Sequence, residues 1–235
     1  MKTIIILAMG ESRAECDFKA DEVWSVNNGY KQVYMEAAPS VRFINKIFLA
    51  HGLDAKDENG AILNWNDFNI MHDKDHVEII NTHRCKGLKA KVFPMKRIAK
   101  KFNTWYFSNT ICYMLSYALD QATKVVDGKL KLKYPLKLRL FGVDMREYRA
   151  DGGGEYTLEK GGVEHWLGIA QGLGVEREIS EGSSLLKTIT KKPYGEKFYD
   201  LKRVDPFGLL KRKKATSSDT PVVYEGELKL TIERV

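Results

Sequence analysis

An apolar run near the start of the chain constrains the fold more than any other segment. Residues 3–9 carry no charge and are rich in β-branched side chains, and they break into Gly10-Glu11-Ser12. A strand in which polar and apolar residues do not alternate is typical of a parallel sheet covered by helices on both faces. A glycine at the end of such a strand lets the backbone approach a ligand, and a serine supplies a hydroxyl. The run therefore predicts a buried parallel strand leading to a ligand site, with an ordinary glycine turn as the alternative.

Strand-like and helix-like segments alternate along the rest of the chain. Further apolar strand-like runs occupy residues 22–26, 46–50, 77–81, 137–141 and 175–179. Apolar residues recur at helical spacing over residues 111–119 and again over residues 163–170, where Gly172 and Gly174 follow as stop signals. This alternation predicts an α/β fold with a Rossmann-like, doubly wound and mostly parallel sheet.

Length and composition favour one main domain with appendages. The 235 residues, 43% of them hydrophobic, suffice for one full core and are few for two. We expect the main domain over residues 1–205, and a basic link with a C-terminal strand or hairpin over residues 206–235. No segment is long enough to span a bilayer, and the start lacks the cleavage site of a secretion signal. The three cysteines show no metal-ligand spacing, so we expect reduced thiols and a cytoplasmic location.

The formal net charge of +7 is concentrated in three basic segments, residues 86–101, 129–139 and 211–214. Such clusters can steer a polyanion or a phosphorylated substrate, and they can equally be solvated faces. The sequence carries no nucleic-acid-binding motif, so DNA is kept as a possible partner only.

Polar turns lie at the ends of two predicted elements. Asn27 and Asn28 follow the second predicted strand, where their amides could contact a base, a ribose or a phosphate; an Asn-Asn-Gly turn is the alternative. Ser108, Asn109 and Thr110 precede the clearest helix. There they could cap the helix, or bind an anion at its positive end.

An acid and a glycine-rich segment follow the strand predicted at residues 137–141. Asp144 comes just past that strand, where it could hold a ribose hydroxyl, a metal ion or a backbone turn. Beyond it, a loop with three glycines and the tyrosines Tyr148 and Tyr156 leads into a helix that carries His165. These are the parts of a lid-like insertion with a general base, and a surface histidine is the alternative. His72 and His76, four residues apart, could share a helical face as a metal pair, but a solvated segment is favoured.

The order of these short motifs resembles that of a known family. The motifs are Gly10-Glu11-Ser12, Asn27-Asn28-Gly29-Tyr30, Ser108-Asn109-Thr110 and Phe141-Gly142-Val143-Asp144. Their series is similar to that of bacterial family-42 sialyltransferases. It is also similar to that of the hydroxymethylpterin pyrophosphokinase-like Rossmann proteins (domain of unknown function 115), whose relatives include motility-associated glycosyltransferases and phage proteins.

This resemblance covers roughly residues 1–184, and it implies a nucleotide-activated sugar donor held between the first three motifs. Tyr148 and Tyr156 would then contact the donor phosphate, and His165 would deprotonate the acceptor hydroxyl. The chain departs from the sialyltransferases at Met9, where they carry asparagine, and at Glu11, where they carry proline. The resemblance therefore implies the fold and the nucleotide crevice more strongly than it implies the identity of the sugar.

The sequence thus predicts a transferase, with a glycosyltransferase as the leading expectation. The acceptor would be a glycan, a small molecule or a hydroxymethylated DNA base. Its proton would pass to the base while tyrosines and backbone N–H groups stabilise the departing phosphate. A required divalent metal is not expected, although Asp144 with Glu155 or Glu159 could hold one. The alternatives are a pyrophosphokinase-like enzyme with Mg²⁺ at Asp144, and a non-catalytic nucleotide- or nucleic-acid-binding protein.

Overall fold

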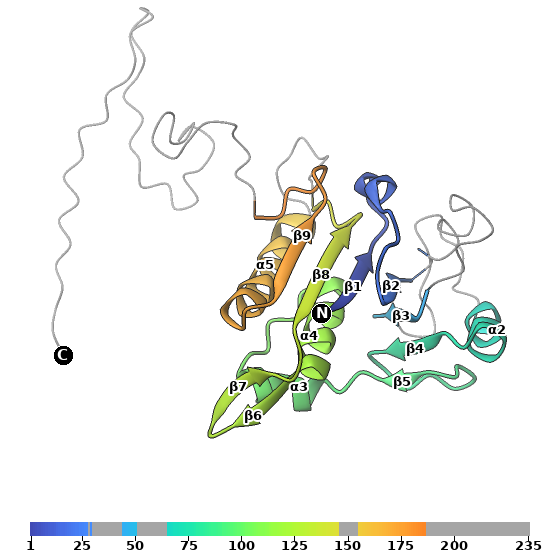
Figure 1. Cartoon of the computed structure of the whole chain (residues 1–235). Coiled ribbons are helices and arrows are strands. Elements are labelled where there is room, and N and C mark those ends of the chain that lie inside the picture. Colours follow the sequence, from blue (N-terminus) through green and yellow to red (C-terminus); the bar gives the residue numbers. More distant parts are fainter. Residues whose placement is uncertain (28, 30–43, 51–64, 146–154, 187–235) are drawn as a thin grey trace, which may run out of the picture. The chain divides into compact units, whose positions relative to one another are not determined.

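A parallel sheet built on the first apolar run forms the centre of the structure, a computed structural model that describes residues 1–27, 29, 44–50, 65–145 and 155–186. The described residues all belong to one unit, Met1–Ile189. The sheet has seven strands in the order β5-β4-β3-β2-β1-β8-β9, and every pairing is parallel (Figure 1). The strands are β1 (Lys2–Leu7), β2 (Glu22–Val26), β3 (Lys46–Leu49), β4 (Glu78–Asn81), β5 (Lys91–Val92), β8 (Leu136–Phe141) and β9 (Glu176–Ile179).

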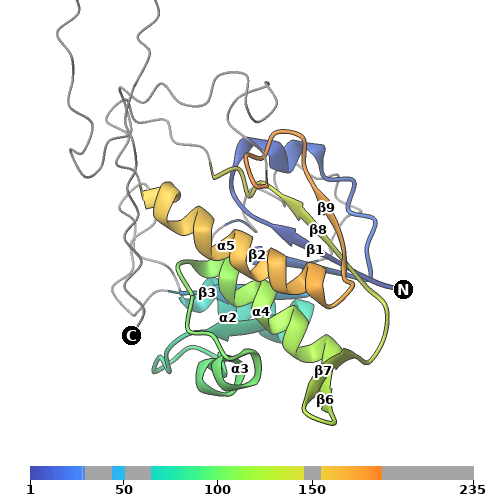
Figure 2. The same ribbon diagram turned by 90° about the vertical axis from the view of Figure 1, so that its left-hand side faces the viewer.

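Helices cover both faces of this sheet, which explains why β1 lacks alternation. The helices are η1 (Glu11–Glu15), α2 (Trp65–Asp75), α3 (Met95–Phe102), α4 (Thr110–Ala122) and α5 (Glu155–Gly172). Ile4 and Ile6 of β1 pack in the core that contains the apolar residues of α3, α4 and α5. Ile5 and Leu7 point the other way, into the core that contains Phe68 of α2. Figure 2 shows α4 and α5 side by side across the first of these faces.

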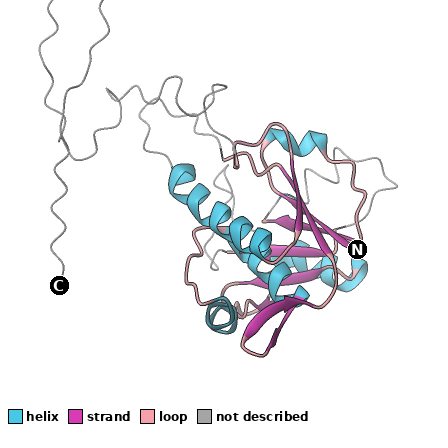
Figure 3. Ribbon diagram, turned by 60° about the vertical axis from the view of Figure 1, so that its left-hand side comes forward, coloured by secondary structure: helices cyan, strands magenta, loops and turns pink. Residues whose placement is uncertain are grey.

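A small antiparallel hairpin interrupts the alternation between α4 and β8. Its strands are β6 (Thr123–Val126) and β7 (Lys129–Leu132), which form a separate two-stranded sheet (Figure 3). Asp127 and Gly128 form the turn with φ of 52° and 71°. Two positive φ values are typical of the tight turn that Asp-Gly favours. This Asp-Gly signal was available in the sequence, where the segment was interpreted only as part of a basic cluster.

The prediction of a doubly wound parallel sheet is confirmed. The six predicted strands match β1, β2, β3, β4, β8 and β9 within two residues at each end, while β5 and the hairpin were missed. The predicted boundary after residue 205, the C-terminal appendage and most of the lid-like loop lie outside the described residues. No helix in the described part of the chain is long and apolar enough to span a bilayer. The three cysteines, Cys16, Cys85 and Cys112, are free thiols.

Candidate functional site

The strand order reverses between β1 and β8. From β1 the chain moves outward through β2, β3, β4 and β5, and it then returns to the other side of β1 to form β8 and β9. Open α/β sheets bind ligands beyond the carboxyl ends of their strands at such a topological switch point. Gly10 and Ser12 follow β1, and Gly142 and Asp144 follow β8, so the structure brings these four residues to the switch point.

Ser12 and Asp144 form the polar centre of this switch point. The Ser12 hydroxyl donates to Asp144 Oδ1, and the Ser12 N–H donates to Asp144 Oδ2 at 3.1 Å. The same hydroxyl accepts from the Gly142 N–H at 3.0 Å and lies 2.7 Å from the Ser180 hydroxyl. A serine hydroxyl has one proton to donate and two lone pairs, so these contacts use its full capacity. Ser12, which is buried, therefore fixes the turn, whereas the half-buried Asp144 retains lone pairs for a further donor.

Two glycines allow the β1 and β8 loops to approach this closely. A Cβ atom on Gly10 would lie 2.5 Å from Asp144 Oδ2 and 2.6 Å from the Gly142 carbonyl oxygen. Gly142 has a φ of 69°, and a Cβ there would collide with the Ala8 carbonyl. The Gly10 N–H donates to the Gly142 carbonyl at 2.8 Å. Arg13 places its guanidinium beside this turn, donating to the Met9 carbonyl at 2.7 Å.

Ser108 and Asn109 form a second group, at the start of α4. Asn109 Oδ1 accepts from the Cys112 N–H at 3.1 Å, so the predicted helix cap is confirmed at Asn109. Asn109 Nδ2 also donates to Glu159 Oε2 at 3.2 Å, and the Ser108 hydroxyl donates to the Glu159 carbonyl at 3.0 Å. Thr110 is the first residue of the helix. Burial raises the pKa of the Cys112 thiol despite its hydrogen bond with Ser108.

The helix α5 contacts the second group directly and is connected to the first through Ser184. On one side Glu159 binds Ser108 and Asn109, as above. On the other, Lys160 Nζ donates to the Ser184 carbonyl at 2.9 Å, and the Ser184 N–H donates to the Asp144 carbonyl at 2.9 Å. The first half of α5 therefore links the start of α4 to the loop after β8.

His165 lies further along α5 and is exposed. Its Nε2 is 3.0 Å from the Thr104 hydroxyl, and its ring centroid is 5.6 Å from that of Tyr106. Among the described residues, its hydrogen bond thus goes to the segment before α4, away from the Ser12–Asp144 pair. Its role as a base stays a prediction.

The remaining predicted site residues are only partly described. Asn27 directly follows β2 with a φ of 41°, and its N–H donates to the Phe48 carbonyl at 3.0 Å. Its position at the carboxyl end of β2 agrees with the prediction. Asn28 and Tyr148 lie outside the described residues, as does the side chain of Tyr156.

Sequence analysis missed three buried polar groups. Ser180, directly after β9, binds the Ser12 hydroxyl, and the rule that polar residues follow strand ends would have found it. Asn81, the last residue of β4, donates to Cys85 Sγ at 3.1 Å. Its Oδ1 has no hydrogen-bond partner among the described residues, and neither has the Ser25 hydroxyl in β2. The same rule marks Asn81, at the end of a predicted strand, whereas no local signal distinguished Ser25 from an ordinary strand residue.

The described residues show no metal centre. Within them, no three histidine, cysteine, aspartate or glutamate side chains are grouped so as to hold a metal ion. The histidine pair is not on one helical face: α2 ends at Asp75, and His76 has a φ of 56°. His72 Nδ1 instead lies 2.9 Å from Asp73 Oδ1.

Comparison of the chain with protein-family models, with characterised proteins and with solved structures finds no significant match. The architecture itself defines the class: an α/β protein with a doubly wound parallel sheet and a polar switch point.

Proposed function

We propose that this protein is a transferase that binds a nucleotide-activated donor at the switch point between β1 and β8. The reaction that we propose is glycosyl transfer to an acceptor hydroxyl. One observation carries the proposal: Gly10 and Gly142 bring two strand-end loops into contact around the half-buried carboxylate of Asp144. This is where doubly wound sheets bind nucleotides.

Asp144 is the residue of this site with capacity for a ligand. An ionised carboxylate offers about four lone-pair sites. Ser12 occupies one on each oxygen, which leaves others for the hydroxyls of a ribose. The positive charge of Arg13, held beside Gly10, would favour the donor phosphates.

A pyrophosphokinase-like enzyme is the second candidate, and it would need Mg²⁺ at Asp144. Each oxygen of this carboxylate already accepts a hydrogen bond from Ser12, and within the described residues Asp144 belongs to no group of three or more potential metal ligands. Mg²⁺ is commonly bound through one or two carboxylates together with substrate phosphates. Asp144 could be such a carboxylate, so the Mg²⁺ dependence of nucleotide binding distinguishes the two candidates.

The first experiment measures thermal stabilisation by CMP, UDP, GDP, ADP and ATP. A ligand at one hundred times its dissociation constant stabilises a protein by about 2.7 kcal/mol. We expect one nucleotide to stabilise the unsubstituted protein and the Asp127→Asn control, which removes an acid from the exposed hairpin turn. Asp144→Asn should weaken that nucleotide by about tenfold or more, a loss of about 1.4 kcal/mol.

Asp144 also holds Ser12, so the shift for each variant is measured relative to the unfolding midpoint of the same variant without nucleotide. Stabilisation by none of the five nucleotides would contradict the proposal, and so would equal affinities of Asp144→Asn and Asp127→Asn. Mg²⁺-dependent binding that Asp144→Asn abolishes would favour the pyrophosphokinase.

A second experiment tests the proposed base. His165→Ala should retain nucleotide binding and lose transfer from the sugar derivative of the nucleotide identified in the panel. His83→Ala, at an exposed histidine in the segment after β4, serves as the control. If His165→Ala remains fully active, the base is another residue. The nucleotide site is tested separately, by the first experiment.

A further inference from the structure

One face of the β6–β7 hairpin carries three lysines and Val126. In the antiparallel register Lys124 lies directly opposite Lys131, and Lys129 lies opposite Val126. Side chains alternate between the faces of a strand, so Lys129 and Lys131 of β7 point the same way as Lys124 of β6, and Lys133 directly follows β7. These four exposed residues, Lys124, Lys129, Lys131 and Lys133, are called the lysine ribbon.

The opposite face of the hairpin attaches it to the domain. Leu130 and Leu132 alternate with the lysines and pack, partly buried, against the main core. The Lys133 N–H donates to the Ala122 carbonyl at 2.7 Å, which continues the attachment at the end of α4. An isolated two-stranded hairpin is marginally stable in water. The apolar face therefore fixes the hairpin, and the lysine ribbon points outward.

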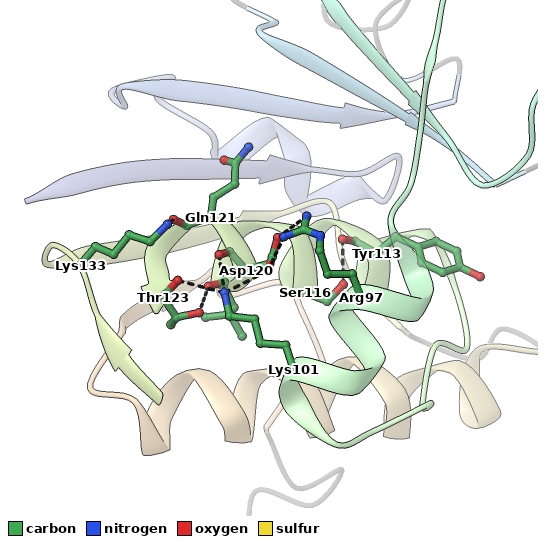
Figure 4. Close-up of polar contacts among 9 residues, drawn as sticks. Arg97, Lys101, Tyr113, Ser116, Asp120, Gln121, Thr123 and Lys133 are labelled. Atoms are coloured by element: carbon green, nitrogen blue, oxygen red, sulfur yellow. Dashed lines mark hydrogen bonds and ion pairs between the residues drawn. The ribbon is translucent and has the colours of Figure 1, made fainter. Parts of the chain in front are cut away.

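A buried ion pair secures the base of the hairpin to α3. The Asp120 side chain, 3% exposed, lies 3.0 Å from Lys101 Nζ and 2.7 Å from Arg97 (Figure 4). Lys101 Nζ also donates to the carbonyl of Thr123, the first residue of β6, at 2.9 Å. These bonds hold α3 against the hairpin. The same helix also carries two exposed lysines, Lys96 and Lys100.

Among the described residues, three lysines of the ribbon lack acidic partners, unlike several lysines of the two basic segments. Lys89 and Lys91 pair with Asp73 and Glu78, and Lys137 pairs with Glu178. Within the described part of the chain, Lys124, Lys129 and Lys131 form no ion pair, and Lys133 Nζ binds the Gln121 carbonyl. Directly opposed like charges destabilise an antiparallel pair. The Lys124–Lys131 pair therefore destabilises the hairpin locally, and a bound anion would reduce this repulsion.

We propose that the lysine ribbon binds the phosphate backbone of duplex nucleic acid, independently of the nucleotide site proposed above. A two-stranded β-ribbon fits the major groove of a duplex. Alternate residues of a strand lie about 6.7 Å apart, so the lysines of β7 offer a row of charges to successive phosphates. Phosphate contacts position a protein without reading sequence, so this surface would bind duplexes of any sequence.

The test measures the anisotropy of a fluorescent duplex of about 20 base pairs over a series of salt concentrations. The ribbon variant combines Lys124→Gln, Lys129→Gln and Lys131→Gln. The control variant combines Lys19→Gln, Lys74→Gln and Lys86→Gln, which removes the same charge from exposed lysines on other elements. We expect the ribbon variant to bind more weakly and to lower the slope of log affinity against log salt by up to about 0.9 for each phosphate that it no longer binds. The control should retain most of the affinity and the slope.

Equal weakening in the two variants would overturn the proposal, because net charge alone would then account for binding. The absence of salt-dependent duplex binding by the unsubstituted protein would also overturn it. Vesicles with anionic lipids provide a further arm: binding to them without binding to the duplex would assign the ribbon to a membrane surface instead. Circular dichroism of both variants checks that the fold is retained.

Discussion

Asp144 accepts hydrogen bonds from both the N–H and the hydroxyl of Ser12, a residue 132 positions away in the sequence. The pair joins the loop after β1 to the loop after β8, the two strands on either side of the reversal in strand order. The candidate ligand site and the stability of the central sheet therefore depend on the same contact.

A double-mutant cycle should detect this contact. Ser12→Ala and Asp144→Ala should each lower the free energy of unfolding by about 1–3 kcal/mol, because each leaves a partly buried polar group without its partner. The double variant should lose less than the sum, with a coupling of about 0.5–3 kcal/mol in urea unfolding. Ser12→Ala combined with Asp73→Ala, on the surface of α2, should be additive. Additivity of the first pair would contradict the contact.

The same substitution should have opposite effects at two glycines. Gly10→Ala should destabilise the protein by about 1–3 kcal/mol, because the new Cβ would meet Asp144 and the Gly142 carbonyl. Gly168→Ala should stabilise it by about 0.5–1 kcal/mol, since Gly168 lies within α5 and its Cβ would meet no atom within 4 Å. Denaturant unfolding compares the two. An unchanged stability of Gly10→Ala would show that the β1 and β8 loops are not so closely packed.

Removal of Asp120 and removal of Arg97 at the base of the hairpin should lower the stability of the protein by unequal amounts. Asp120→Ala should cost about 3 kcal/mol, because it leaves the largely buried ammonium of Lys101 without its counter-charge. Arg97→Ala should cost less than about 1 kcal/mol, because the Arg97 side chain is 61% exposed. Thermal and urea unfolding measure both. Similar losses in the two variants would mean that Asp120 depends on Arg97 as much as on Lys101.

The stability of the protein should fall in acid. At the amino ends of β2, β3 and β4, Lys46 Nζ lies 3.0 Å from a carboxylate oxygen of Glu22 and 3.1 Å from one of Glu78. Burial alone would raise the pKa of each glutamate, but hydrogen bonds from neighbouring lysines outweigh it, and the pKa of each is lowered. A carboxylate with a lowered folded-state pKa contributes stability that is complete above its unfolded pKa of about 4.3 and is lost as pH falls through the folded value.

The free energy of unfolding should therefore decrease steadily below about pH 5. Glu22→Gln should lower stability at neutral pH and make its decline in acid shallower. Urea unfolding at a series of pH values measures both effects. A decline in Glu22→Gln as steep as that of the unsubstituted protein would remove Glu22 as a contributor.

The cap of α4 shows how far local sequence could specify the candidate site. Asn109 was predictable because capping depends on a side chain and an N–H three residues apart. The same residue's bond to Glu159, 50 positions away, was not predictable, because it requires α5 to pack beside α4. His165 illustrates the same limit: its place on a helix was visible in the apolar spacing, but its contact with Thr104 depends on where that helix lies.

The partners of the lysines in the basic segments also depended on the tertiary structure. Runs of lysine in the sequence look like uniform patches, yet strand register decides the partner of each side chain. Lys137 and Arg139 lie on β8 beside Glu178 of β9, whereas Lys129 and Lys131 extend from a hairpin. Charge along the chain therefore left open a polyanion, a phosphorylated substrate and a solvated face, and only the fold shows which lysines have an acidic neighbour.

The sequence by itself determined six strands of the parallel sheet and the helices α4 and α5, because apolar periodicity and uninterrupted β-branched runs act over a few residues. It also marked Gly10, Ser12 and Asp144, because polar residues at strand ends are visible without neighbours. Only the tertiary structure decided that Ser12 is fully engaged by Asp144, Gly142 and Ser180, while Asp144 keeps capacity for a ligand. These contacts join segments more than a hundred residues apart, and they form only when the sheet places β1, β8 and β9 side by side.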